Sequence, residues 1–461
     1  MKNILFTLVL WLFTFTASAQ QSWQVVGQPG FSEGMPQPFL FPQSLALDNN
    51  GIPYVAYAEY ISEEDGARGV VKKFENNTWE TIGDEFHMNW GNLFIGASLV
   101  FNSDNVPYIA YTDQSNLAKV TVKKLENGSW QQVGTPISES YSGNSSSAFN
   151  SNDILYILFR DGSNSGKATV MKFENNTWQV VGVAGFSSGA IQFTSLAFDN
   201  NDIPYVIYSD EANNSKATVM KFENNSWLSI GDETGVSTMT SINNQIFISS
   251  DNIPCIAYRS SVLIDNSYIP IAVFKKYINN EWQQVGELIF LEGVGSISFG
   301  LHNDVPYVAY TDWENDDKAT VKKFETNNWQ IVGTIGFSED IAYNVTLAFN
   351  NDGVPYVVFR DMANDNRITV MKYDSTMSVD THTHSNILLY PNPANDVVII
   401  DNIPDNSIIN IYDITGKLVY TSQTDTQTVI NIADFANGIY LVQLVSNNQQ
   451  QTVKKLVINK Y

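Results

Sequence analysis

The 461-residue sequence contains a single cysteine, Cys255, so no disulfide can form within the chain. Positive charge is also scarce, because 25 Lys and Arg residues face 48 Asp and Glu residues, for a net charge of −23. That field repels nucleic acids and anionic membrane surfaces, so neither is expected as a partner. After residue 15 no apolar run approaches the roughly 18 residues that span a bilayer, so no transmembrane segment is expected.

Patterns typical of metal sites and of nucleophilic catalysis are missing too. The four histidines do not follow a zinc-ligand spacing, and the acidic turns do not follow that of a calcium loop. No nucleophile elbow occurs either. We therefore expect no metal and no cofactor, and we assign no catalytic residue.

The N-terminal segment predicts secretion. Lys2 supplies a positive start, residues 4–15 are apolar, and Ala17-Ser18-Ala19 offers a small-residue cleavage site. We interpret residues 1–19 as a signal peptide.

A repeat dominates the region that follows. The stretch KATVMKFENNTWQVVG at Lys167 returns almost unchanged as KATVMKFENNSWLSIG at Lys216. Equivalent tryptophans recur seven times, at Trp23, Trp79, Trp130, Trp178, Trp227, Trp282 and Trp329. Each unit contains four short runs rich in Val, Ile, Tyr, Phe, Trp and Thr, separated by Asn- and Asp-rich turns. Helical periodicity is not evident, so the fold class is all-β.

Four strands in a unit of 40 to 50 residues predict the blade of a β-propeller. The repeat begins with a tryptophan strand at Trp23 and ends after the third strand of the seventh unit, at Tyr373. We therefore predict a seven-bladed propeller over residues 20–373, closed by the N-terminal strand, which completes the last blade and removes a free edge. A solenoid would need capping ends, and none is evident.

Charges at the hairpin between the second and third strands follow a pattern. An acid ends the second strand and a cation begins the third in six blades, and blade 5 lacks both. We interpret them as structural partners across the hairpin. The pairs are Glu59 with Arg68, Asp113 with Lys119, Asp161 with Lys167, Asp210 with Lys216, Asp312 with Lys318, and Asp361 with Arg367.

Three of the five arginines, Arg160, Arg259 and Arg360, share the position just before that acid, in blades 3, 5 and 7. Arginine binds carboxylates in a bidentate manner, so these residues are candidates for holding an anion or an acidic sugar; the alternative is that they only pack. Arg259 is the strongest candidate because its own hairpin lacks the acid. Aromatic residues in loops expected on the same rim are further candidates, either for stacking on sugars or for packing the loops: Trp90, Phe186, Trp313 and Phe337.

The composition changes after Tyr373. Residues 374–386 are polar and form a predicted linker, and residues 387–461 contain LYPNPANDVVII, INIYDITGKLVY, FANGIYLVQL and the closing KKLVINKY. These motifs resemble the C-terminal sorting domain of type IX secretion substrates of the Bacteroidota. The resemblance implies an immunoglobulin-like β-sandwich, recognition by the secretion machinery, and removal of the domain on export, followed by release or by attachment at the cell surface.

The sequence thus predicts a secreted or surface-attached monomer that binds an extracellular glycan or protein. An enzyme is the less favoured interpretation, as a propeller hydrolase or lyase acting on polysaccharide. A structural surface protein without a small ligand is the third. Fold alone does not decide among them.

Overall fold

A computed structural model describes residues 22–34, 44–62, 66–88, 97–113, 116–290, 296–374, 388–401, 403, 407–413, 416–424, 428–445 and 451–460. The predicted signal peptide, nearly all of the predicted linker, and Trp90 lie outside these residues. The chain divides into a large unit, residues 21–375, and a second unit that contains residues 376–461. No helix within the described ranges is long and apolar enough to cross a membrane.

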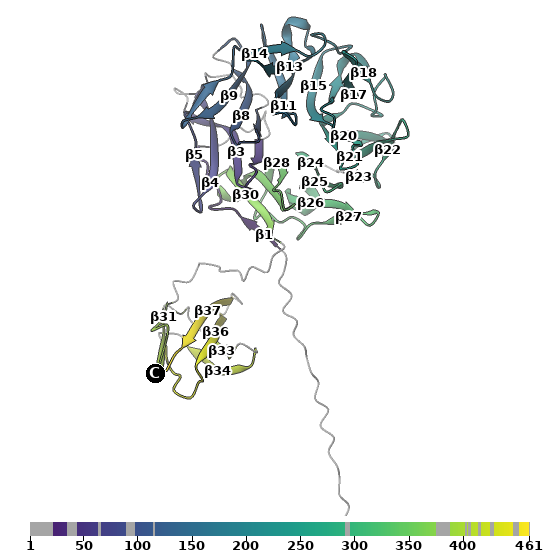
Figure 1. The fold of residues 1–461 in the computed structure, drawn as a ribbon. Helices are drawn as coiled ribbons and strands as arrows, with labels where there is room; N and C mark the ends of the chain where they lie inside the picture. Colours follow the sequence, from purple (N-terminus) through teal and green to yellow (C-terminus); the bar gives the residue numbers. More distant parts are fainter. Residues whose placement is uncertain are drawn as a thin grey trace, which may run out of the picture. The chain divides into compact units, whose positions relative to one another are not determined.

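The large unit is a ring of seven antiparallel sheets in its described residues, which confirms the predicted propeller (Figure 1). Blade 1 consists of β2 (Ser44–Leu47), β3 (Pro53–Ser62), β4 (Gly66–Glu75) and β5 (Thr78–Thr81). Blade 2 consists of β7 (Ser98–Phe101), β8 (Pro107–Asp113), β9 (Lys119–Glu126) and β10 (Ser129–Gln132). Blade 3 consists of β11 (Ser142–Phe149), β12 (Leu155–Asp161), β13 (Lys167–Glu174) and β14 (Thr177–Val180). Blades 4 and 5 are β15 (Ile191–Phe198), β16 (Pro204–Asp210), β17 (Lys216–Glu223), β18 (Ser226–Ser229); and β19 (Ile242–Ile248), β20 (Pro254–Ile264), β21 (Ser267–Ile278), β22 (Glu281–Gln284). Blades 6 and 7 are β24 (Ile297–His302), β25 (Val305–Asp312), β26 (Lys318–Glu325), β27 (Asn328–Ile331); and β28 (Ala342–Phe349), β29 (Pro355–Asp361), β30 (Arg367–Asp374) with β1 (Ser22–Val25).

Short elements extend some blades. The strands β6 (Phe86–Met88) and β23 (Ile289–Phe290) add to β4 and β21, respectively. Single 3₁₀ turns lie in the second hairpin of four blades: η2 (Gly162–Asn164), η3 (Glu211–Asn213), η4 (Trp313–Asn315) and η5 (Met362–Asn364).

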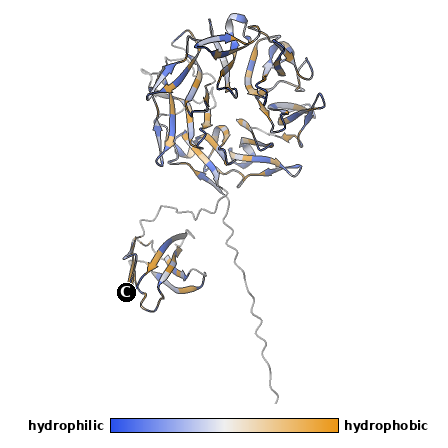
Figure 2. Ribbon diagram, in the orientation of Figure 1, coloured by the Kyte–Doolittle hydropathy of each residue, from blue (hydrophilic) through white to orange (hydrophobic). Residues whose placement is uncertain are grey.

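The second strand of each blade is buried on both faces, because neighbouring blades pack against each face. All seven residues of β16 are buried, for example, which explains its nearly continuous apolar sequence. Apolar segments accordingly run along the strands of each blade (Figure 2).

The repeated tryptophan joins adjacent blades. In each blade its indole N–H donates to a backbone carbonyl of the preceding blade, at N···O distances of 2.8 to 3.1 Å. In six blades the glycine of the repeated Val-Gly or Ile-Gly lies against the next tryptophan; at Gly231 a Cβ atom would come within 2.5 Å of Trp282. The sixteen residues are therefore repeated because they form both the outer hairpin of a blade and the contact to its neighbour.

A second set of contacts links the Asn- and Asp-rich hairpins between the first and second strands. The backbone N–H of Ser151, for example, donates to the Asp202 carboxylate of the next blade at 2.9 Å, and Ser103 makes the same contact to Asp153. These turns therefore provide structural links from blade to blade.

The second unit is a two-sheet β-sandwich. One sheet has the order β31 (Leu388–Tyr390), β32 (Val397–Asp401), β35 (Thr428–Asn431), and the other β34 (Leu418–Thr424), β33 (Ser407–Asp413), β36 (Gly438–Val445), β37 (Gln451–Ile458). Both sheets contribute to one apolar core, in which Val398, Ile409 and Val442 are fully buried.

Candidate functional site

The hairpin acid forms the predicted ion pair in blade 1, whereas in blades 3, 4, 6 and 7 it accepts hydrogen bonds within its own hairpin or from the neighbouring loop. The Cα register places acid and cation opposite each other, as in Asp161 with Lys167, and blade 1 has the expected ion pair, Glu59 to Arg68 at 2.6 Å. In blade 3, however, the buried carboxylate of Asp161 accepts hydrogen bonds from the Ser163 N–H, the Asn164 amide and the Thr169 hydroxyl, at 2.8 to 3.0 Å. Capping of the 3₁₀ turn takes the place of the ion pair, because these donors lie within the hairpin itself. The acids of blades 4, 6 and 7 are used in related ways: Asp210, Asp312 and Asp361.

The three candidate arginines lie at equivalent positions on β12, β20 and β29. Arg160 approaches Glu211 of the next blade at 3.9 Å, and the Arg360 guanidinium lies 4.6 Å from the ring centre of Tyr343, with its Nε atom buried. Arg259 is half-buried and has no hydrogen-bond or ion-pair partner among the described residues. Burial lowers the pKa of Arg259 and of Arg360. Because β12, β20 and β29 belong to blades 3, 5 and 7, the three arginines lie in separate blades around the ring.

Two of the candidate aromatic residues are used in packing between blades. Phe186 stacks on Trp227 at a centroid distance of 4.4 Å, and Phe337 stacks on Trp23 at 4.1 Å. Packing between blades, one of the two interpretations that the sequence allows, therefore accounts for both rings. Trp313 is 60% exposed at the start of η4 and stays a candidate, and Trp90 lies outside the described residues.

The loops carrying these phenylalanines share one anchoring scheme. The Phe186 N–H donates to the Ala168 carbonyl, and the Ser187 hydroxyl accepts from the Ala168 N–H. The same two contacts recur in four other loops, so five loops place an equivalent side chain toward the next blade. Those side chains are Phe31, Ile137, Phe186, Val236 and Phe337.

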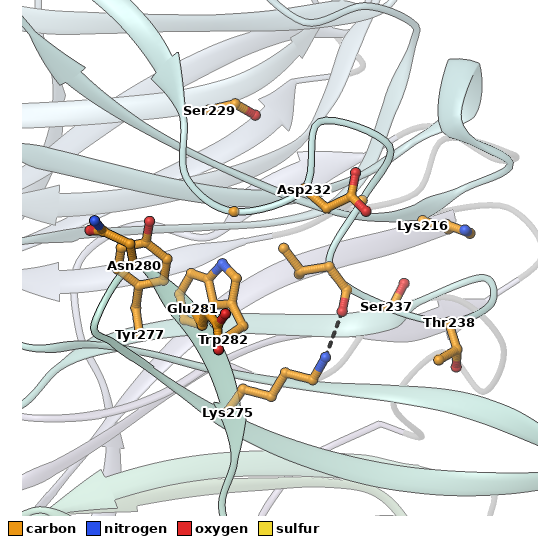
Figure 3. A pocket seen from close by; sticks show the side chains of 13 residues that line it. Lys216, Ser229, Asp232, Ser237, Thr238, Lys275, Tyr277, Asn280, Glu281 and Trp282 are labelled. Carbon is orange, nitrogen blue, oxygen red and sulfur yellow. Dashed lines mark hydrogen bonds between the residues drawn. The ribbon is translucent and has the colours of Figure 1, made fainter.

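Val236, the smallest of the five, lines a pocket at the junction between blades 4 and 5. Figure 3 shows this pocket, with Lys275, Tyr277 and Trp282 among its labelled residues. In the loops with phenylalanine, the ring covers a tryptophan, whereas here Trp282 lines a pocket of about 770 Å³. Tyr277, Lys275 and Lys216 also line it, together with Ser229, Asp232, Thr238, Asn280 and Glu281. The pocket therefore combines two aromatic rings with groups of both charges.

Lys275 contributes a partly buried ammonium group to the pocket. Its ammonium donates a 2.7 Å hydrogen bond to the carbonyl of Val236, as the dashed line in Figure 3 marks. Burial lowers the pKa of Lys275. At the mouth, the Asp232 carboxylate accepts from both the N–H and the hydroxyl of Thr234, which lowers the pKa of Asp232.

Sequence reasoning missed this pocket. Two features of the sequence could have indicated it. Val236 replaces the phenylalanine of a repeated Gly-Phe-Ser motif, and Lys275 stands where three other blades have methionine. The pocket and the rest of the described chain hold no group of three His, Cys, Asp or Glu side chains that could bind a metal.

Comparison with known proteins identifies the second unit. Residues 388–459 match the family described as "Secretion system C-terminal sorting domain". They form a type IX secretion sorting domain. The protein is therefore secreted through that system, with release or attachment at the cell surface as its destination.

Similarity to whole proteins is more limited. An endo-acting ulvan lyase of Formosa agariphila is 34% identical over 88 residues, which are 18% of this chain and 17% of that protein. The chain thus matches less than a fifth of this curated relative. Among solved structures, a polysaccharide lyase described as a family 25 ulvan lyase aligns with 75% of this chain and 94% of its own, at 12% identity and a TM-score of 0.48. PorZ, a surface component of the type IX system of Porphyromonas gingivalis, aligns with 94% of this chain and 61% of its own, at 13% identity and a TM-score of 0.42.

Proposed function

We propose that this secreted propeller binds an extracellular glycan in the pocket between blades 4 and 5. One observation carries the proposal: Val236 leaves Trp282 facing a pocket, where a phenylalanine of the same chain covers the tryptophan in other junctions. The apolar face of a pyranose is flat, as a phenyl ring is, and can occupy the same place on an indole.

The polar lining favours a sugar over an aromatic side chain of a protein partner. Hydroxyl, amide, carboxylate and ammonium groups surround Trp282 and Tyr277, and a sugar hydroxyl can both donate to and accept from such groups. A phenyl ring would leave them without hydrogen bonds on desolvation, which is costly.

A glycan array probed with the purified chain tests this proposal, followed by hydrogen exchange with the strongest binder. Bound glycan should slow exchange in residues 229–238 and 275–282, and leave the corresponding segments of blades 3 and 4, residues 180–187 and 220–227, unchanged. Absence of glycan binding, or protection elsewhere on the ring, would contradict the proposal.

A polysaccharide lyase is the second candidate, because an ulvan lyase is among the curated proteins that match a short part of this chain. The same glycans should therefore be incubated with the protein while unsaturated products are followed by their ultraviolet absorbance. If the protein cleaves a glycan, and a variant whose pocket is filled by Val236→Phe still cleaves it, the result would favour the lyase and place its active site outside this pocket.

A further inference from the structure

The repeat position of Lys275 is occupied by two kinds of residue. Each blade pairs this position with its outermost strand in the same register, which makes the seven residues structurally equivalent. Three blades have methionine and four have lysine: Lys72, Lys123, Met171, Met220, Lys275, Lys322 and Met371. A lysine here is thus an alternative to an apolar side chain and is not required by the fold.

The other three lysines find a partner in their own chain. The ammonium of Lys72 lies 3.6 Å from the Glu33 carboxylate. Lys123 lies over the ring of Phe86 at 4.9 Å, and Lys322 over that of Tyr310 at 5.6 Å. In these blades an anion or an aromatic face compensates the charge.

Lys275 lacks such compensation. Among the described residues its ammonium has one hydrogen-bond acceptor, the Val236 carbonyl, and no carboxylate within ion-pair distance. An ammonium has three N–H donors, so two remain for a ligand. The lowered pKa of Lys275 is consistent with this lack of a partner, because burial without a counter-charge disfavours the charged form.

We infer that the pocket selects an acidic pyranose, whose carboxylate or sulfate is bound by Lys275 while the ring lies on Trp282. This inference rests on the proposed function and adds the class of sugar. A charge-assisted hydrogen bond in a partly desolvated site is about twice as strong as a neutral one, so it discriminates acidic from neutral rings.

The acids at the mouth of the pocket contribute to the same selection. Asp232 and Glu281 lie at its exposed edge, in a protein of net charge −23, and repel an anion placed there. An acidic sugar is therefore favoured with its anionic group inward, beside Lys275, and its neutral hydroxyls at the rim.

The test compares acidic oligosaccharides with their neutral counterparts. Oligogalacturonate and oligoalginate would each be titrated beside the carboxyl-reduced form, and a sulfated carrageenan oligosaccharide beside its desulfated form, so that the carboxylate and sulfate arms are separate. The proteins would be the purified full chain, Lys275→Met, and the matched control Lys322→Met. Methionine occupies the equivalent position in three blades, so these substitutions suit the fold.

We expect at least one acidic member to bind the native chain about tenfold more tightly than its neutral form. Lys275→Met should bind the two forms equally, and Lys322→Met should keep the preference. Equal binding of each pair by the native chain, or a preference that survives in Lys275→Met, would overturn the acidic-sugar inference alone. If no member of any pair binds although the array identifies a glycan bound in this pocket, the acidic-sugar inference fails alone; absence of binding on the array as well would overturn the proposed function with it.

Discussion

The indole N–H of Trp23 donates a 2.8 Å hydrogen bond to the carbonyl of Val332, although 309 positions separate the two residues. Trp23 also pairs with Tyr373 in the register of β1 and β30, and it stacks on Phe337. The first described strand thus completes the seventh blade and joins it to the sixth, so the ends of the propeller are held by the same contact that links the other blades.

Replacing Trp23 by alanine should lower stability by about 3–5 kcal/mol, because a large buried aromatic and its hydrogen bond are lost at the closure of the ring. Thermal unfolding of the variant measures the effect. Trp313→Ala is the matched control and should change the midpoint little, since Trp313 is 60% exposed. Equal midpoints for native protein and Trp23→Ala would contradict closure by this strand.

Removing residues 387–461 should stop export while leaving the propeller folded. The apolar core of the sandwich is built from its own residues, so the truncation leaves the cores between the blades intact. Immunoblotting of periplasm, surface and medium in the native host measures the location. Normal appearance of the truncated chain in the medium would contradict the role of the sorting domain in this protein.

The arginines of the second strands provide a comparison with the pocket. Arg259 is half-buried and has no hydrogen-bond or ion-pair partner among the described residues. A carboxylated ligand bound to it would lose about 1.5–3 kcal/mol of binding free energy in Arg259→Ala, whereas a ligand held in the pocket by Lys275 should bind Arg259→Ala and the native chain equally. Lys172→Ala is the control, because Lys172 forms a partly exposed pair with Glu174 at 2.7 Å. If Arg259→Ala weakens binding while Lys275→Met and Val236→Phe do not, the ligand binds at the rim and not in the pocket.

Binding of an acidic oligosaccharide should depend on pH through Lys275. Its ammonium must be protonated to bind the anion, and burial lowers its pKa below the usual 10.5. Affinity should therefore be constant around neutrality and fall as pH rises through this lowered pKa, earlier than for an exposed lysine. Lys216 and Tyr277 line the same pocket, so titrations of Lys275→Met by calorimetry provide the background to subtract. An alkaline loss of equal size in that variant would contradict the assignment to Lys275.

The repeat was predictable from sequence because each blade uses the same local chemistry. Asn- and Asp-rich turns, β-branched strands and a tryptophan at fixed spacing specify four strands and their order, and the phase of the repeat at Trp23 specifies closure. Lys172 and Glu174, two residues apart on one face, likewise form the ion pair that strand geometry implies.

The site was less predictable because it depends on contacts between blades. Nothing in the sequence around Phe186 indicates that its ring lies on Trp227, and without that contact the valine at position 236 is an ordinary apolar variant. The hairpin acids show a similar limit. Asp161 and Lys167 face each other as predicted, but the buried carboxylate meets closer donors within its own turn.

Filling the pocket tests the proposed function most directly. Val236→Phe introduces the residue found at this position in three other loops, and the new ring should stack on Trp282 as Phe186 does on Trp227. Calorimetric titration with the strongest binder from the array would compare it with the native chain and with Ile137→Phe, the same change at the junction of blades 2 and 3. We predict that Val236→Phe keeps or raises the thermal midpoint and abolishes binding, whereas Ile137→Phe binds normally. Undiminished binding by a folded Val236→Phe variant would contradict the placement of the glycan between blades 4 and 5.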